Sequence, residues 1–166
     1  VTLNNGRAYK RSEWEEAGTP VIRIQNLNGG DNFFYSNMSL PERQYCDYGD
    51  LLFAWSASFG PYIWEGGKCI YHYHIWKIDL LNGLERDFAY YLLRLLTNEI
   101  RISSHGAIML HTTKESMEKR YIPLPLLEEQ KRIAAILNEQ MAAVEKAKKA
   151  AEERLEAAKA LPAAYL

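Results

Sequence analysis

The stretch "IPLPLLEEQKRIAAIL", residues 122–137, is where the chain changes in composition. Before it, aromatic residues, glycines and short alternating apolar segments dominate, whereas Ala, Glu, Lys and Leu follow it without a single glycine. Pro123 and Pro125 predict an extended segment, because a residue that precedes proline avoids the α conformation. The change therefore predicts a boundary, with one domain at residues 1–126 and a helical region at residues 127–166.

The helical region carries an apolar pattern with alternating spacings of four and three residues, which is typical of a coiled coil. Lys148 is the one charged interruption in this pattern. A helix from Leu127 to Leu161 would be about 50 Å long at ~1.5 Å per residue, and Pro162 predicts its end. We expect this helix to pair with a partner helix outside the globule. The predicted seam consists of Leu137, Met141, Val144, Ala151, Leu155 and Ala158.

Three segments before the boundary are rich in β-branched and aromatic residues and have Gly or Asp at their edges. They are 21–27 (VIRIQNL), 51–55 (LLFAW) and 69–78 (CIYHYHIWKI), and each is predicted to form a strand. Glycine and proline pairs between them predict turns.

Two helices are predicted within the first domain. Residues 87–97 carry an apolar stripe at helical spacing, with Asp87 as the expected N-cap. Thr112 and Glu115 have the spacing of a capping box, which predicts a short helix from Lys114. The predicted fold class is therefore α+β, a mixed α/β domain followed by a long C-terminal coiled-coil helix.

Composition limits the function classes. The chain has 166 residues, of which 48% are hydrophobic and 12% aromatic, and its formal net charge is −1. This apolar share predicts a packed core, and the charge means that any nucleic-acid surface must be a local basic patch. Cys46 and Cys69 predict buried thiols in a cytoplasmic protein. No apolar run approaches ~18 residues, so we expect no membrane association.

Motifs of catalysis are missing from the sequence. It contains no P-loop, no dinucleotide-binding glycine run and no G-x-S-x-G elbow. His72 and His74 would share one face of the expected strand 69–78, as two metal ligands could, but partly buried strand residues are the more common case. Asp50 and Glu65 could form a carboxylate pair, although single acids in turns are usually caps or solvated. We expect no catalytic residue, no metal and no cofactor.

Three polar segments, "NNGRAYKR", "IRISSHG" and "LHTTK", carry residue types that contact phosphates and base edges of DNA. Each segment alone is more often a solvated surface, so its significance depends on the fold. We expect Arg101, His105 and Lys114 to share one DNA-facing side, with Arg7 and Lys10 as weaker candidates. The candidate DNA-binding residues are Arg7, Lys10, Arg101, Ser104, His105, Thr113 and Lys114.

The order of four segments resembles the target recognition domain and helical region of a type I restriction–modification specificity subunit. The segments are "GTPVIRIQNLN", "YGDLLFAWSASFG", "YHYHIWKI" and "SSHGAIMLHTTKESMEKRYIPLPLLEEQKRIAAIL". The resemblance covers nearly the whole chain and is most specific at residues 122–137. Two features depart from the family. Tyr71, His72 and Tyr73 replace a small polar residue and Asn near the strand histidine, and the chain has one recognition domain with one helical region instead of two of each.

The resemblance implies a non-catalytic subunit that reads one half of a bipartite double-stranded DNA target. The helix would pair antiparallel with another such helix and set the distance to the second half-site. Separate modification (methyltransferase) subunits and restriction subunits would dock on this scaffold. The chain is accordingly expected to form a homodimer through its C-terminal helix, or to be half of a longer subunit.

Two alternatives remain open at the level of sequence. The chain could be the recognition domain of a type II-like nuclease or methyltransferase with its own chemistry, or a coiled-coil adaptor that does not bind DNA. Against the first, no amino-methyltransferase motif is present, and Glu65 and Lys68 have the wrong spacing for a nuclease cluster. Against the second, an adaptor would leave the aromatic globule without a role.

Overall fold

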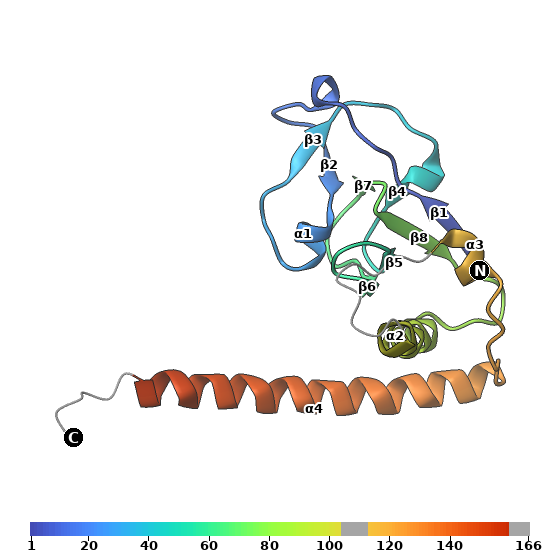
Figure 1. The fold of residues 1–166 in the computed structure, drawn as a ribbon, viewed down its shortest axis with the longest axis vertical. Helices are drawn as coiled ribbons and strands as arrows, with labels where there is room; N and C mark the ends of the chain where they lie inside the picture. The colour runs from blue at the N-terminus through green and yellow to red at the C-terminus, as the bar shows by residue number, and fades with distance from the viewer. Residues whose placement is uncertain (104–112, 160–166) are drawn as a thin grey trace.

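Two four-stranded sheets and a long helix that leaves them dominate the computed structural model, which describes residues 1–103 and 113–159 (Figure 1). The first sheet is antiparallel throughout and pairs its strands in the order β1-β8-β5-β6. Its strands are β1 (Thr2–Asn5), β8 (Ile75–Asp79), β5 (Leu51–Ala54) and β6 (Gly60–Ile63).

The second sheet has the order β3-β2-β7-β4 and contains one parallel pair, β2 with β7. The pairs β2–β3 and β4–β7 are antiparallel. The strands are β3 (Phe34–Ser36), β2 (Thr19–Ile22), β7 (Cys69–Tyr71) and β4 (Tyr45–Cys46). Cys46 and Cys69 face each other in this register as free, buried thiols with their Sγ atoms 3.3 Å apart, which confirms the predicted burial.

Four α-helices and two short 3-10 helices complete the described residues. Helix α2 packs on the first sheet, α3 lies beside β1, and α4 runs beneath α2 and continues well past the globule (Figure 1). The helices are η1 (Arg11–Glu13), α1 (Ile24–Leu27), η2 (Glu42–Gln44), α2 (Arg86–Ser103), α3 (Lys114–Glu118) and α4 (Leu127–Lys159). No helix in these described parts is long and apolar enough to cross a membrane.

The core lies on both faces of β5, because successive strand side chains point to opposite sides. Leu51 and Phe53 join one buried cluster beneath α2, where the ring of Phe53 stacks on that of Trp76 with centroids 5.8 Å apart. Leu52 points the other way, into a second cluster with Ile75 and residues of the second sheet. All four residues of β5 are therefore buried, as the predicted strand at 51–55 requires.

The predicted strand at 69–78 is wrong in one respect, because a turn at residues 72–74 divides it into β7 and β8. The backbone of Arg7 inserts at this turn. Its N–H donates to the Tyr71 carbonyl at 3.1 Å, and its carbonyl accepts from the Tyr73 N–H at 3.0 Å. The chain uses the turn to pass from the second sheet to the first, so His72 and His74 do not share one face of a strand.

The predicted strand at 21–27 ends at Ile22, and residues 24–27 form α1 instead. Asn26 explains the difference. Its side-chain oxygen accepts from the Arg23 N–H at 2.9 Å, and its amide donates to the Gly30 and Asn32 carbonyls at 3.1 and 3.0 Å. Such local side-chain bonds to the backbone compete with strand pairing.

Helix α2 was predicted at 87–97 and extends further in both directions, but Asp87 is not its N-cap. The Glu85 carboxylate accepts from the Phe88 N–H at 2.7 Å, whereas the Asp87 carboxylate accepts from Asn138 of α4 at 3.0 Å. Helix α3 begins at Lys114 as predicted. Its N-cap is Thr113, whose hydroxyl accepts from the Ser116 N–H at 3.1 Å, while Thr112 lies outside the described residues.

Helix α4 is attached to the globule through Gln130, whose side chain is completely buried. The Gln130 amide donates to the carbonyls of Gly83 and Pro125, both at 2.8 Å, and its oxygen accepts from the Glu85 N–H at 2.9 Å. One side chain thus joins the loop before α2, the proline segment and the first turn of α4. A second contact follows two turns later, where the Tyr91 hydroxyl donates to Asn138 at 2.7 Å.

We expect Gln130→Leu to lower the free energy of unfolding by about 2–4 kcal/mol, because three partly buried backbone groups would lose their hydrogen-bond partner while the side chain keeps a similar volume. Urea unfolding followed by circular dichroism measures this change. Gln140→Leu is the matched control, since Gln140 lies exposed on the same helix and should change stability little. Equal stabilities of the two variants would contradict the role given to Gln130.

Candidate functional site

Arg23 and His72 lie at the same edge of the second sheet because they follow the only parallel pair of strands among the described residues. Ile22 of β2 is in register with Tyr71 of β7, so the next residue of each strand leaves the sheet at the same place. The His72 N–H donates to the Ile22 carbonyl at 2.9 Å and holds the two segments together. The carboxyl ends of parallel strands thus bring a cation and an imidazole into proximity.

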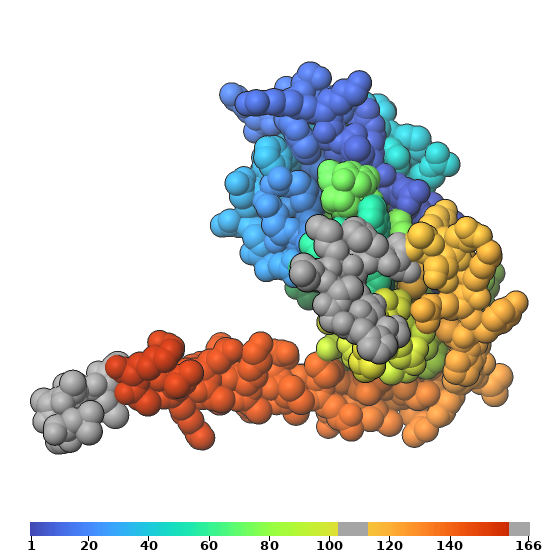
Figure 2. Space-filling view, viewed as in Figure 1, coloured from blue at the N-terminus to red at the C-terminus, as the bar shows by residue number. Residues whose placement is uncertain are grey.

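The turn at residues 72–74 presents three rings in succession. The Tyr73 and His74 ring centroids are 3.8 Å apart, and those of His72 and His74 are 5.1 Å apart. Tyr73 is 39% exposed at the tip. Trp55 supports the turn, since its indole N–H donates to the Tyr73 carbonyl at 2.8 Å. In Figure 2 the green segment that contains this turn reaches the surface next to the blue N-terminal residues.

The loop after β5 has a strained backbone, since Ala57 adopts the left-handed conformation with φ of 55°. Hydrogen bonds around Ser58 hold this loop in place. The Asn28 amide donates to the Ser58 hydroxyl at 2.9 Å, and the Tyr62 hydroxyl donates to the Ser58 carbonyl at 3.0 Å. The loop thereby fixes α1 and Trp55 beside the turn.

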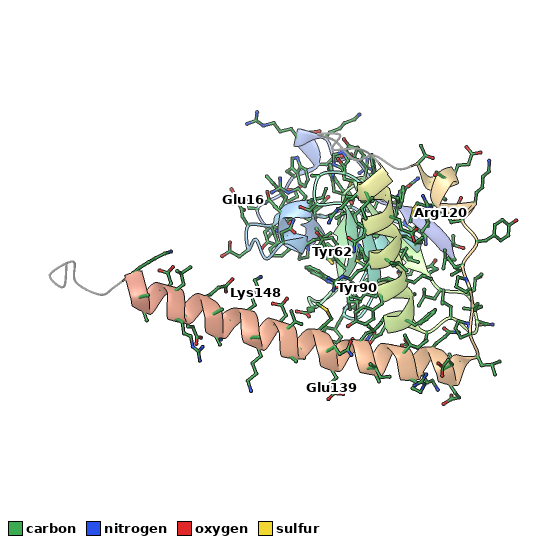
Figure 3. The ribbon with its side chains drawn as sticks, turned by 60° about the horizontal axis from the view of Figure 1, so that its bottom comes forward. Glu16, Tyr62, Tyr90, Arg120, Glu139 and Lys148 are labelled. Atoms are coloured by element: carbon green, nitrogen blue, oxygen red, sulfur yellow. The ribbon has the colours of Figure 1, made fainter. Side chains whose placement is uncertain are left out.

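A groove of about 450 Å³ adjoins this loop. Tyr62 and Tyr90 line it, and Figure 3 shows the two tyrosines between α1 and α2. Tyr62 connects the groove to the strained loop, since it lines the groove and its hydroxyl bonds to Ser58.

Arg23 has a stacked position without an acidic partner. Its guanidinium carbon lies 3.9 Å from the centroid of the Phe34 ring, and its Nε is buried without a hydrogen-bond partner. Burial lowers the pKa of the guanidinium from its ordinary value. Trp14 in turn contacts Phe34 in a tilted arrangement, with ring centroids 4.5 Å apart. The guanidinium of Arg23 therefore lies at one end of a small aromatic cluster.

His72 is neutral at pH 7. Its pKa falls from 6.5 to about 4, first because the ring is partly buried and then because His74 and Arg23 add positive charge nearby. A neutral imidazole both donates and accepts hydrogen bonds. Together with the Tyr73 hydroxyl and the Arg23 guanidinium, the site offers planar, directional groups of the kind that read the edges of bases.

The structure places the predicted DNA-binding residues in different parts of the globule. Arg7 reaches the turn through its backbone, and its guanidinium pairs with Glu13 at 2.6 Å. Lys10 is exposed at the start of η1, where its N–H donates to the Glu13 carboxylate at 2.7 Å. The Arg101 guanidinium donates to the Phe59 carbonyl at 2.7 Å, close to the strained loop.

The remaining predicted residues lie around α3. Lys114 forms an ion pair with Glu118 at 3.6 Å, and the hydroxyl of Thr113 caps the helix. Ser104 and His105 lie outside the described residues. Of the predicted residues that the structure describes, Arg7 alone lies at the turn, and contact of any of these residues with DNA stays a prediction.

Sequence reasoning missed Arg23 and the recognition role open to the turn at residues 72–74. A signal was present for Arg23, since it is a lone cation within the apolar segment "VIRIQ". The two histidines are interpreted from sequence as possible metal ligands or, more commonly, as partly buried strand residues, and neither interpretation indicates a role in recognition. Within residues 1–103 and 113–159, no group of three metal-binding side chains is found.

Comparisons with known proteins agree on one family. The family model described as "Type I restriction modification DNA specificity domain" matches residues 1–154. The type I restriction enzyme EcoBI specificity subunit of Escherichia coli is 26% identical over 151 residues, which are 89% of this chain and 32% of that protein. The MjaVIII specificity subunit of Methanocaldococcus jannaschii is 34% identical over 91 residues, 54% of this chain and 21% of that protein.

Solved structures confirm the predicted fold class. The HsdS subunit from Thermoanaerobacter tengcongensis aligns with a TM-score of 0.69 and 25% identity, covering 90% of this chain and 37% of that one. A chain from a study of type I restriction–modification complex assembly aligns with a TM-score of 0.72, a likeness of fold at 23% identity that covers 93% and 40%. The chain spans about a third or less of the length of the EcoBI and MjaVIII specificity subunits.

The depressed pKa of His72 predicts a pH-dependent stability. Between pH 6.5 and about 4 the unfolded chain binds a proton at this position more readily than the folded chain, so the free energy of unfolding should fall as the pH is lowered. The decrease from pH 7 to 5 should be on the order of 1 kcal/mol, after allowance for solvent screening of a half-exposed ring. Urea titrations of the wild-type chain and His72→Gln measure it, and identical pH dependence in both would show that His72 is not responsible.

Proposed function

Because the chain belongs to the family of type I restriction modification DNA specificity domains, we propose that it reads one half of a bipartite duplex target. The observation that carries the proposal is the extent of the family match, which covers residues 1–154 and so includes both the globule and most of α4. A domain with a protruding helix of this kind combines a DNA-reading surface with a scaffold.

The turn at residues 72–74 and the neighbouring cations are the proposed DNA-facing surface. Exposed Lys10 and Arg11 on η1 would contact phosphates, which position a protein on the duplex without reading sequence. Tyr73, His72 and Arg23 would then face the base edges. The patch is small, in agreement with the net charge of −1, so affinity of the chain alone should be modest and salt-dependent.

The seam of α4 is the proposed partner surface. Leu137 lines an apolar groove with Tyr91 and Leu95 of α2, and the same face of α4 continues beyond the globule. Figure 3 shows Lys148 on the side of α4 that faces the globule and Glu139 on the opposite side. Val144 and Leu155 are each 55% exposed on this face. We propose that an antiparallel helix covers them, from a second copy or from the other half of a longer subunit.

Methylation and cleavage of the DNA would then be carried out by other subunits. We propose that modification and restriction subunits dock on this scaffold in the cytoplasm and that the chain itself is non-catalytic. The absence of nuclease and methyltransferase motifs from the sequence supports this division. A self-contained nuclease or methyltransferase would cleave DNA with Mg²⁺ or methylate it with S-adenosylmethionine, whereas an adaptor would show no duplex binding at low salt.

We expect the full 166-residue chain to bind randomised duplexes at low salt and to lose affinity as salt rises. Tyr73→Ala should weaken this binding by about 2- to 10-fold, because each hydrogen bond to the duplex contributes about 0.5–1.5 kcal/mol. Fluorescence anisotropy measures the change. Tyr121→Ala is the control, since Tyr121 is fully exposed in the segment before α4. An equal effect of both variants would place the DNA surface away from the turn.

The seam of α4 predicts association that two aspartates abolish. Burial of a large apolar side chain contributes about 1.5–3 kcal/mol, so Val144→Asp combined with Leu155→Asp should weaken association by roughly 100-fold or more. Ala142→Asp with Ala157→Asp introduces the same charges on the opposite face, at ~100° per residue, and should leave association unchanged. Sedimentation velocity distinguishes the two. A wild-type chain that stays monomeric at high concentration would contradict a homodimer.

A further inference from the structure

Arg23 differs from the other cations near the turn because its guanidinium lies against an aromatic ring while its charge has no ion-pair partner among the described residues. Arg7 donates to the Glu13 carboxylate, whereas no acidic side chain forms an ion pair with Arg23 within the part of the chain that the structure describes. The Phe34 ring lies 3.9 Å from its guanidinium carbon. A half-buried cation in this position has lost part of its hydration without gaining an acidic partner in exchange.

The geometry also selects which edge of the guanidinium is available. Nε is buried without a partner, and it is the only Arg23 nitrogen in that condition. The two terminal nitrogens are therefore the edge that can meet a ligand. This edge donates two parallel hydrogen bonds in one plane, which matches a pair of acceptors spaced like O6 and N7 of guanine.

A phosphate is the weaker match for Arg23. Phosphate contacts require charge but little orientation, and exposed Lys10 and Arg11 supply that charge without fixed planes. A guanidinium that lies against an aromatic ring is suited to a planar partner instead. His72 lies beside Arg23 as a neutral hydrogen-bond donor and acceptor, which can bond to the edge of the neighbouring base pair.

We propose that Arg23 reads one guanine in the major groove of the target, through its two terminal nitrogens, with Phe34 as the platform that orients it. This inference rests on the proposed function, since it assigns one specificity-determining residue to the DNA-facing surface. Any other base at this position would leave the half-buried guanidinium without hydrogen-bond acceptors. Guanine would therefore be preferred both for the two hydrogen bonds that it makes and for the penalty of the unpaired cation that it avoids.

Selection from a pool of randomised duplexes, with the full 166-residue chain at low salt, tests the proposal. The wild-type pool should hold guanine at one position, and Arg23→Gln should reduce that preference roughly 5- to 150-fold while the other positions keep theirs. Arg23→Lys keeps the charge but not the planar fork, so it should lose the same preference with an unchanged salt slope. Arg154→Gln removes the same charge close to the C-terminal end of α4 and should change nothing at this position.

Three results would overturn the assignment, and they differ in what else they affect. Unchanged preferences in Arg23→Gln would remove Arg23 from base reading and leave the proposed function intact. Equal weakening on all sequences, with a salt slope reduced by about one, would make Arg23 a phosphate contact. A wild-type chain without any sequence preference would overturn the proposed function itself. If Arg23→Gln fails to fold by circular dichroism, Arg23→Lys decides the question, because its aliphatic stem still packs on Phe34.

Discussion

The three hydrogen bonds of Gln130 are the constraint on which the shape of the molecule depends. The Gly83 carbonyl and the Glu85 N–H in the loop before α2, and the Pro125 carbonyl in the proline segment, all bond to the buried side chain of Gln130 on α4. Together with the bonds of Asn138 to Tyr91 and Asp87, they set the direction of α4 relative to the sheets. The long helix is therefore part of the folded domain at its first turns and an independent arm only beyond α2.

A second constraint produces the candidate site. The chain passes from the second sheet to the first at the turn between β7 and β8, and Arg7 fills the gap with its backbone. The ring of Tyr73 is exposed there, and those of His72 and His74 are partly exposed, because the strand is interrupted. The same topology makes β2 and β7 parallel, which places Arg23 at that edge. The proposed recognition surface is thus a consequence of how the two sheets are joined.

The elements that depend on local sequence could be predicted. Helix α4 begins at Leu127 as its period and the prolines indicate, α3 begins at Lys114, and β5 occupies the expected apolar run. Prediction failed where a residue that is distant in the sequence determines the local structure. The strand at 69–78 is broken by a backbone segment some 65 residues earlier, and Asp87 bonds to Asn138 on α4 rather than capping its own helix.

The candidate site was the hardest feature to predict from the sequence, because contacts between distant segments bring its residues together. Arg7 was selected from its loop, but its neighbours at the turn come from β2, β5 and β7. Arg23 and His72 are 49 positions apart, and only the parallel register of Ile22 and Tyr71 brings them together. Composition does not reveal this register, because both strands are short and consist mostly of apolar residues.

The free part of α4 also acts as a lever. The last hydrogen bond to α2 among the described residues is at Asn138, and 21 residues extend from there to Lys159, about 32 Å at ~1.5 Å per residue. A tilt of about 10° at the anchored end would displace the far end by roughly 5–6 Å, more than the ~3.4 Å rise of one base pair. The angular stiffness of the Gln130 and Asn138 contacts would then determine how narrowly an assembly built on this helix tolerates changes in target spacing.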